Sequence, residues 1–148
     1  MHAYTPAIQR PVRSFSPQLL RQARERAGLT QQALADLAEM ARTNYVNLEN
    51  GARRPGPTTL ARVAAACGIP AHELSGLAPE QATLRDLREW AGFSQAEAAH
   101  AAGWESATTY ARIELGTAKL STDRAQALAA AFCVTTDAVT AAAERPPA

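Results

Sequence analysis

Apolar residues recur every three or four positions in short stretches along most of the chain, and glycine, proline or a small polar residue bounds each stretch. This spacing predicts short amphipathic helices, because residues three and four apart lie on the same face of a helix. Much of the apolar share is alanine, which favours helices over strands. The pattern therefore predicts an all-α protein.

Capping residues divide the first half of the chain into five predicted helices. Small polar residues that cap helix starts, and glycines that follow helix ends, mark their limits. The predicted helices run from Pro17 to about Ala27, from Thr30 to about Ala38, from Arg42 to Glu49, from Pro57 to about Gly68, and over a short stretch after Pro70.

The sequence of this half occurs a second time. Residues 20–31, LRQARERAGLTQ, are similar to residues 84–95, LRDLREWAGFSQ, at an offset of 64 positions. Further along the offset is 65, because one residue has been added in the turn that begins at Gly103. Ser94 and Glu97 have the spacing of a capping box, which again begins a helix. The chain is a tandem duplication, with a first domain at residues 17–76, a linker over residues 75–79 and a second domain at residues 77–140.

Charge is distributed unevenly between these parts. The formal net charge is +1, but residues 1–16 contain two Arg and no acidic residue, and the first domain contains seven Arg and five acidic residues. The second domain contains four Arg, one Lys and eight acidic residues. The first half is therefore basic, as suits a nucleic-acid-binding surface, whereas the second is acidic, so one function need not cover both.

The two ends of the chain lack helical spacing. Residues 1–16, which include two Pro, are predicted to form a flexible basic arm, either a disordered leader or a segment that contacts DNA. Residues 141–148 are predicted to be a fraying tail. No apolar run is long enough for a signal peptide or a membrane span, so a cytoplasmic protein with reduced core thiols at Cys67 and Cys133 is expected.

Two short motifs in the first domain carry a family resemblance. GLTQxxLA at residues 28–35 and LENG at residues 48–51 resemble the phage-repressor class of helix-turn-helix proteins, the lambda Cro and repressor (XRE-like) type. The resemblance covers about residues 17–74 and again about residues 82–140. It implies two tandem five-helix domains of the lambda-repressor type, in which the third helix enters the major groove of double-stranded DNA.

The resemblance places the base-reading residues on the predicted third helix. The first two positions and one a turn later face the bases, namely Arg42, Thr43 and Asn47, with Asn44 beside them. Arg suits the O6 and N7 acceptors of guanine, Asn suits adenine, and the Thr methyl can contact a thymine methyl. Glu39 departs from the family pattern, because a glycine usually makes this turn and a left-handed Glu costs about 1–2 kcal/mol.

Phosphate contacts are expected on either side of that helix. Gln31 begins the second helix, where free N–H groups and the helix dipole attract an anion. Asn50, Arg53 and Arg54 follow the third helix, in the loop that grips phosphates in the family. The alternative for the two Arg residues is a solvated polar loop.

Other residues of the motif are expected to be structural. Ala35 and Ala99 are small enough for the second and third helices to approach closely. In the family, an ion pair joins the first helix to the end of the third, and removing one partner would leave a buried charge alone. The residues at these positions are Arg24 with Glu49 and Arg88 with Glu114. Apolar residues expected to close the angle between the two helices are Leu34, Ala38, Met40, Tyr45 and Leu48.

The second domain keeps these structural residues but changes the reading surface. Its turn is one residue longer, and its third helix offers Ala107, Thr108 and Arg112. Gln95 and Lys119 are its candidate phosphate contacts. An acidic domain loses much of the attraction to phosphates, so the sequence leaves open whether these residues contact DNA.

The predicted function is a sequence-specific, double-stranded DNA-binding transcriptional regulator, associated with a bacterial or phage nucleoid. Repression is expected because the sequence contains no recognisable sensor domain or activation surface. Either both domains read successive half-sites, or the first reads DNA while the second forms a homodimer or binds a protein. The alternative is an antitoxin-like autoregulator whose acidic second domain binds a basic protein. Catalysis, cofactors and metals are not expected, because His2, His72 and His100 are not grouped with a nucleophile or a ligand motif.

Overall fold

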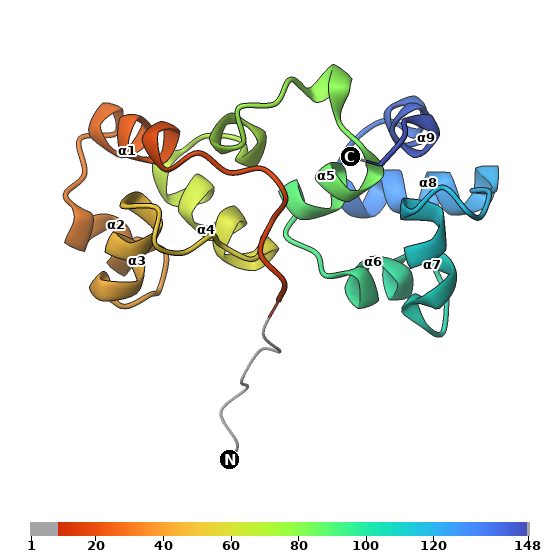
Figure 1. Cartoon of the computed structure of the whole chain (residues 1–148), viewed down its shortest axis with the longest axis horizontal. Coiled ribbons are helices and arrows are strands. Elements are labelled where there is room, and N and C mark those ends of the chain that lie inside the picture. Colours follow the sequence, from red (N-terminus) through yellow and green to blue (C-terminus); the bar gives the residue numbers. More distant parts are fainter. Residues whose placement is uncertain (1–8, 148) are drawn as a thin grey trace, which may run out of the picture.

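The computed structural model describes residues 9–147, within which every regular element is a helix and two similar domains lie side by side (Figure 1). This confirms the predicted all-α fold with two tandem five-helix domains. The helices of the first domain are α1 (Pro17–Arg26), α2 (Gln31–Leu37), α3 (Arg42–Glu49), α4 (Pro57–Cys67) and the 3-10 helix η1 (Ala71–Leu74). The linker contains the 3-10 helix η2 (Pro79–Gln81), and the second domain contains α5 (Leu84–Trp90), α6 (Gln95–Ala101), α7 (Ala107–Glu114), α8 (Thr122–Phe132) and α9 (Thr136–Glu144).

Side-chain caps fix most of the helix starts. Ser16 and Thr30 each accept a backbone N–H from the first turn of α1 and α2, and the capping box predicted for α6 is present. A second capping box, formed by Thr83 and Asp86, begins α5. Its T-x-x-D spacing is visible in the sequence, although the sequence prediction placed a box only at the start of α6.

Each domain has its own core, and the core of the first domain positions α3. Tyr45 and Leu48 are buried beneath α3, and Ala35 is buried where α2 packs against α3. The equivalent Tyr110 and Ala99 are buried in the second domain. The predicted apolar residues are therefore core residues, although the side chain of Met40 remains half-exposed.

The turn between α2 and α3 begins with the same backbone conformation as the turn between α6 and α7, although the latter is one residue longer. Glu39 has a φ of 57° and the equivalent Gly103 has a φ of 89°, both in the left-handed region. The N–H of the next residue, Met40 or Trp104, then bonds back to a helix carbonyl at 2.9 Å in each case. The first domain thus makes a left-handed turn with a non-glycine residue, which costs about 1–2 kcal/mol.

The N-terminal segment, residues 9–16, is extended and bound to both domains. Val12 is buried in the first core and donates its N–H to the Pro55 carbonyl at 2.8 Å. The Arg13 guanidinium forms an ion pair with Asp86 of α5 at 2.5 Å, and the Arg13 N–H donates to Glu89 at 2.9 Å. The prediction of a flexible arm is therefore wrong for residues 9–16, and its remainder, residues 1–8, lies outside the described residues.

The two domains are also in direct contact. Helix α4 packs against α5, and Trp90 at the end of α5 packs against the cores of both domains. The Thr58 hydroxyl donates to the Gly92 carbonyl at 3.3 Å, and the rings of His72 and Trp90 are 5.6 Å apart. Together with the N-terminal segment, these contacts join the domains into one unit.

The domains are arranged head to tail. Their contact joins the fourth helix of the first domain to the first helix of the second, whereas a two-fold contact would pair the same surface of both. A two-fold contact would also pair the first helix of the first domain, α1, with the fourth helix of the second, α8. These two helices instead lie at opposite ends of the molecule (Figure 1). The chain enters α2 along the outer edge of the first domain but enters α6 on the side that faces the first domain (Figure 1). This arrangement does not provide the symmetry of a palindromic site.

Two sequence predictions about other parts of the chain are corrected. Helix α9 continues to Glu144, and the Arg145 guanidinium donates to the Ala82 carbonyl at 2.5 Å, so the predicted fraying tail is bound through this residue. Cys133 follows α8, at the position that Gly68 occupies after α4; it is exposed and has a φ of 56°. Cys67 is only partly buried. Neither thiol is a fully buried core group.

Within the described residues, no single helix combines the length and the apolar composition needed to cross a membrane. Only α8 and α9 taken together meet that test, and these two helices are bent by 111° at their junction. Both contribute buried side chains to the second core, among them Leu128 and Val139. Their apolar composition is accounted for by this packing.

Candidate nucleic-acid interface

Helix α3 has one buried face and one exposed face. Tyr45 and Leu48 face the core, whereas Arg42, Thr43 and Asn44 in the first turn are exposed. The helix begins after Ala41, which supplies no side-chain cap, so its first N–H groups are not covered by a capping side chain. Three of the four predicted base-reading residues therefore lie together at an accessible helix start, and the fourth, Asn47, is half-buried one turn later.

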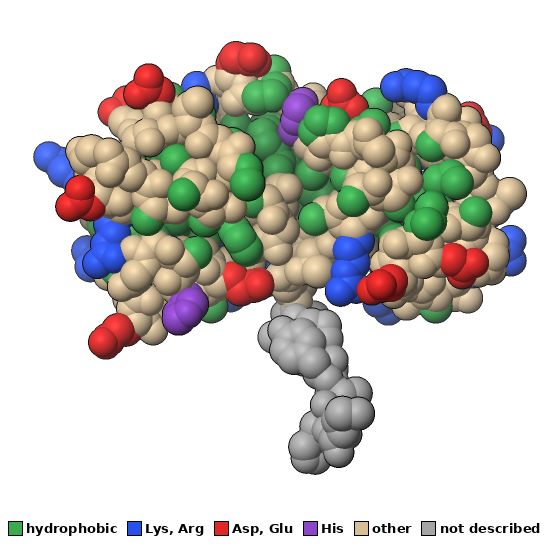
Figure 2. All heavy atoms as spheres, turned by 180° about the vertical axis from the view of Figure 1, so that it is seen from behind, with side chains coloured by type: hydrophobic (Ala, Val, Ile, Leu, Met, Phe, Trp, Pro, Cys, Tyr) green, Lys and Arg blue, Asp and Glu red, His purple; other side chains and the backbone are tan. Residues whose placement is uncertain are grey.

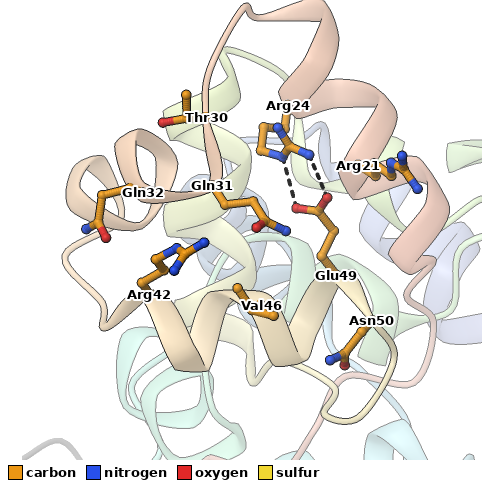
Figure 3. Close-up of a pocket in the computed structure, with 9 residues that line it drawn as sticks. All are labelled: Arg21, Arg24, Thr30, Gln31, Gln32, Arg42, Val46, Glu49 and Asn50. Carbon is orange, nitrogen blue, oxygen red and sulfur yellow. Dashed lines mark hydrogen bonds and ion pairs between the residues drawn. The ribbon is translucent and has the colours of Figure 1, made fainter.

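A concave surface of about 940 Å³ lies between the start of α2 and the outer face of α3. Figure 3 shows Gln31 and Arg42 projecting into it from these two helices, with Val46 on its α3 side. Asn50 lies at its far end, near the end of α3. The structure thus brings together a predicted base contact and two predicted phosphate contacts on one surface.

Three residues that line this surface were predicted neither as contacts nor as structural residues. Arg21 comes from α1, Gln32 from the first turn of α2, and Val46 from the middle of α3. Arg21 and Gln32 are exposed polar residues on helix faces, and nothing in their spacing distinguishes them from solvated positions. Val46 could have been found from the sequence, since it lies one turn after Arg42 on the helix.

The Arg24–Glu49 ion pair forms one wall of the concave surface. Two guanidinium nitrogens of Arg24 donate to the two carboxylate oxygens of Glu49 at 3.0 and 2.8 Å, and a third donates to the Leu29 carbonyl at 2.9 Å (Figure 3). Burial is the largest single influence and would raise the pKa of Glu49, but the hydrogen bonds to its carboxylate, chiefly those from Arg24, and the charge of Arg24 together outweigh burial and lower that pKa. The hydrogen bond to Glu49 also raises the pKa of Arg24. The pair stays charged and joins α1 to α3.

The second domain contains the same ion pair in a more buried form. Arg88 donates to both oxygens of Glu114 at 2.6 and 3.3 Å, and the two side chains are only 7% and 5% exposed. Burial is the largest single influence and opposes the charge of Arg88, but the hydrogen bond to Glu114 and the negative charge of Glu114 together outweigh it and raise the Arg88 pKa. These four residues hold the two helix-turn-helix units in the same shape.

The loop after α3 carries the remaining predicted phosphate contacts. Asn50 is exposed, and its side-chain oxygen accepts the Ala52 N–H at 2.9 Å, which shapes the start of the loop. Arg53 is exposed and its side chain has no ion pair within residues 9–147. Arg54 is exposed as well, but its guanidinium donates to the Arg13 carbonyl of the N-terminal segment.

The corresponding residues of the second domain are placed differently. Gln95 donates to Glu114 at 3.0 Å, so its side chain turns toward the ion pair, and Ala107 is half-buried. Thr108, Arg112 and Lys119 are exposed.

The start of α6 faces the first domain across a cleft of about 880 Å³. Gln9 occupies this cleft, since its amide nitrogen donates to Glu97 in the first turn of α6 at 3.0 Å, and its amide oxygen accepts the Thr58 N–H at 2.7 Å. The helix start that would receive a phosphate in the family mode is therefore partly covered.

The described part of the chain offers no arrangement suited to metal chemistry. Among residues 9–147, no group of three or more His, Cys, Asp or Glu side chains is placed to hold a metal ion. His72 packs against Trp90 between the domains, and His100 lies on the exposed side of α6.

Comparison with protein families finds the same two repeats as the structure. The family described as "Helix-turn-helix domain" matches residues 18–77 and again residues 82–143, which together make up most of the chain. No curated protein and no solved structure gives a match. The family match therefore rests on both repeats, and each repeat contains one of the two units described above.

Proposed function

Because the chain belongs to the helix-turn-helix family, we propose that it is a sequence-specific transcriptional regulator that reads the major groove with α3 of the first domain. The observation that carries this proposal is the exposed first turn of α3, with Arg42, Thr43 and Asn44 beside the concave surface. Arg and Asn are the side chains best suited to guanine and adenine edges, and each bidentate contact contributes about 1–3 kcal/mol of discrimination.

Contacts to phosphates would then fix the orientation of α3. The start of α2 carries Gln31, and the loop after α3 carries Asn50 and Arg53, all facing the same surface or adjoining it. Helix starts and Arg side chains are the usual phosphate-binding groups, and they add affinity without base specificity. The phosphate contacts and the base contacts are thus assigned to different residues of one domain.

We assign no base reading to the second domain. Its helix start is partly covered by Gln9, and its α7 presents Ala107 where the first domain presents Arg42. The head-to-tail contact of α4 with α5 also lacks the two-fold symmetry of a palindromic site. The unit of recognition is accordingly a single half-site for each chain. Repression is the expected outcome, because a protein bound at a promoter blocks polymerase without any further surface.

The test uses the full chain and a duplex that it selects from a random pool. Arg42→Ala is expected to weaken binding to the selected duplex by roughly 5- to 150-fold, the equivalent of about 1–3 kcal/mol, and to relax the preference at one base pair. Binding to an unrelated duplex should change much less. Arg53→Ala is the matched control, since it should weaken both duplexes alike and reduce the salt dependence.

The outcome that contradicts base reading by α3 is equally direct. If Arg42→Ala and Asn47→Ala fold normally and leave the ratio of affinities for selected and unrelated duplexes unchanged, another surface reads the sequence. Circular dichroism of each variant establishes that the fold is intact.

A second candidate role concerns the second domain alone. Leu115, which follows α7 at the position of Asn50 in the first domain, is 65% exposed, and this substitution replaces a phosphate-binding side chain by an apolar one. Exposed apolar residues of this kind favour contact with protein, here a second copy of the chain. On the rear face of the molecule, hydrophobic side chains lie dispersed among polar ones (Figure 2). Light scattering of the full chain and of Leu115→Asn tests whether a dimer forms through this residue.

A further inference from the structure

The N-terminal segment extends the surface on which phosphate contacts are proposed. It runs along the loop between α3 and α4, where Arg54 donates to the Arg13 carbonyl and Val12 donates to Pro55. Gln9 then reaches the first turn of α4, where it accepts the Thr58 N–H. The cleft between the domains begins where this loop ends, so it lies next to the residues proposed to bind DNA.

The cleft contains positive charge that the protein does not neutralise. Arg10 of the N-terminal segment and Arg62 of α4 both line it, and both are exposed. Neither forms an ion pair or a side-chain hydrogen bond within residues 9–147. Arg62 lies one turn after Thr58 on α4, which places it on the same side of the helix as the N-terminal segment.

The acidic residues of the cleft are already occupied. Glu89 accepts hydrogen bonds from the Arg13 N–H at 2.9 Å and from the Arg85 side chain at 3.1 Å. Glu97 accepts the Ser94 N–H within its capping box and the amide of Gln9, each at 3.0 Å.

The third carboxylate of the cleft, Glu114, is held by Arg88 and Gln95. Every side-chain carboxylate of residues 9–147 that lines the cleft therefore has partners within this part of the chain. The two Arg side chains remain for an anion from outside.

We infer that Arg10 and Arg62 form a second phosphate clamp, which holds the DNA backbone beyond the half-site read by α3, on the side of the second domain. This inference rests on the proposed function. The backbone is the appropriate ligand because it is a continuous row of phosphates, and the cleft adjoins the loop that carries Arg53. The second domain then contributes one wall of the clamp without reading bases.

The experiment measures how the affinity of the full chain for its selected duplex depends on salt. Each phosphate contact contributes about 0.9 to the slope of log K against log salt concentration, so Arg10→Ala and Arg62→Ala should each lower the slope by about 1. Between about 50 and about 200 mM salt, the wild-type affinity should fall about 3.5-fold more than that of each single variant. Arg26→Ala, which removes an exposed Arg at the end of α1 outside the cleft, should leave the slope unchanged.

Shortening the duplex supplies a second readout. Base pairs are trimmed from either end of the duplex in turn. Trimming at one end should weaken wild-type binding, whereas trimming at the other should not. Neither should affect the Arg10→Ala/Arg62→Ala double variant. Equal slopes for the wild type and both single variants would overturn the clamp, and so would an equal loss of slope in Arg26→Ala. If Arg42→Ala abolishes specificity while these slopes do not change, base reading by α3 stands and the clamp is wrong. If the wild type binds no duplex, both are wrong.

Discussion

The ion pair between Arg13 and Asp86 is the contact that most directly ties the N-terminal segment to the second domain. The Asp86 side chain is only 1% exposed, and Arg13 approaches both of its oxygens, at 3.2 and 2.5 Å. Replacing Arg13 by Ala would leave this carboxylate buried without its counter-charge. We therefore predict that Arg13→Ala destabilises the protein strongly, although residue 13 precedes the first helix.

The size of the effect can be worked from the contacts that remain. Removing one partner of a buried ion pair costs about 3–5 kcal/mol. Asp86 would retain hydrogen bonds from the Thr83 N–H and hydroxyl, both at 2.9 Å, and Arg13 is itself 24% exposed, so water can reach the site. We therefore expect a loss of about 2–3 kcal/mol, which lowers the melting temperature of a chain of this length by about 5–10 °C.

The assay is thermal and urea unfolding of Arg13→Ala, Asp86→Asn and the double variant. The amide oxygen introduced by Asp86→Asn could still accept the bonds from Thr83, so the cycle isolates the charge pair, with an expected coupling of about 1–3 kcal/mol. Arg10→Ala is the matched control, because Arg10 has no partner in the described residues and should change stability by at most about 0.5 kcal/mol. A coupling energy below about 0.5 kcal/mol would refute the reasoning.

Two further predictions concern the first domain. Glu39→Gly should raise the free energy of unfolding by about 0.5–1 kcal/mol, because it relieves a left-handed residue and makes the turn like that at Gly103; urea unfolding measures this, and a loss of stability would contradict it. The lowered pKa of Glu49 stabilises the folded state above the unfolded-state value of about 4.3, and this stabilisation is lost as pH falls through the lower folded-state pKa. In Glu49→Gln, the free energy of unfolding should therefore decrease less steeply below about pH 4 than it does in the control variant Glu25→Gln. Identical pH profiles of the two variants would exclude this role of Glu49.

The sequence was sufficient to predict the fold class and the order of the helices in both domains. Helix α3 runs from Arg42 to Glu49, as predicted, and the repeat located its equivalent in the second domain, including the longer turn. The pairing of Arg24 with Glu49 followed from the resemblance. The helices, the turn and the ion pair occur in both domains. The residues that form a helix in one domain therefore also show which helix of the other domain it corresponds to.

Contacts between the domains could not be predicted in this way. The N-terminal segment has no helical period, and its main partner, Asp86, lies 73 positions away in sequence. Arg10 and Arg13 are alike by type, yet one is exposed and the other is paired with a buried acid. The only local sign of a structural role for Asp86 was the T-x-x-D spacing of the capping box at the start of α5. The packing of α4 against α5 depends on surfaces that no repeat defines, because the two copies use different helices.

The head-to-tail order of the domains gives the protein a direction. A two-fold symmetric reader looks the same from either strand, so turning its site around changes nothing. Here the second domain follows the first in one direction, because α4 packs against α5 and the N-terminal segment is bound to both domains. On the proposed mode of binding, α3 occupies its half-site and the second domain covers the DNA on one side of it only. On the proposed mode of binding, inverting the site within a promoter would move that covered flank to the opposite side.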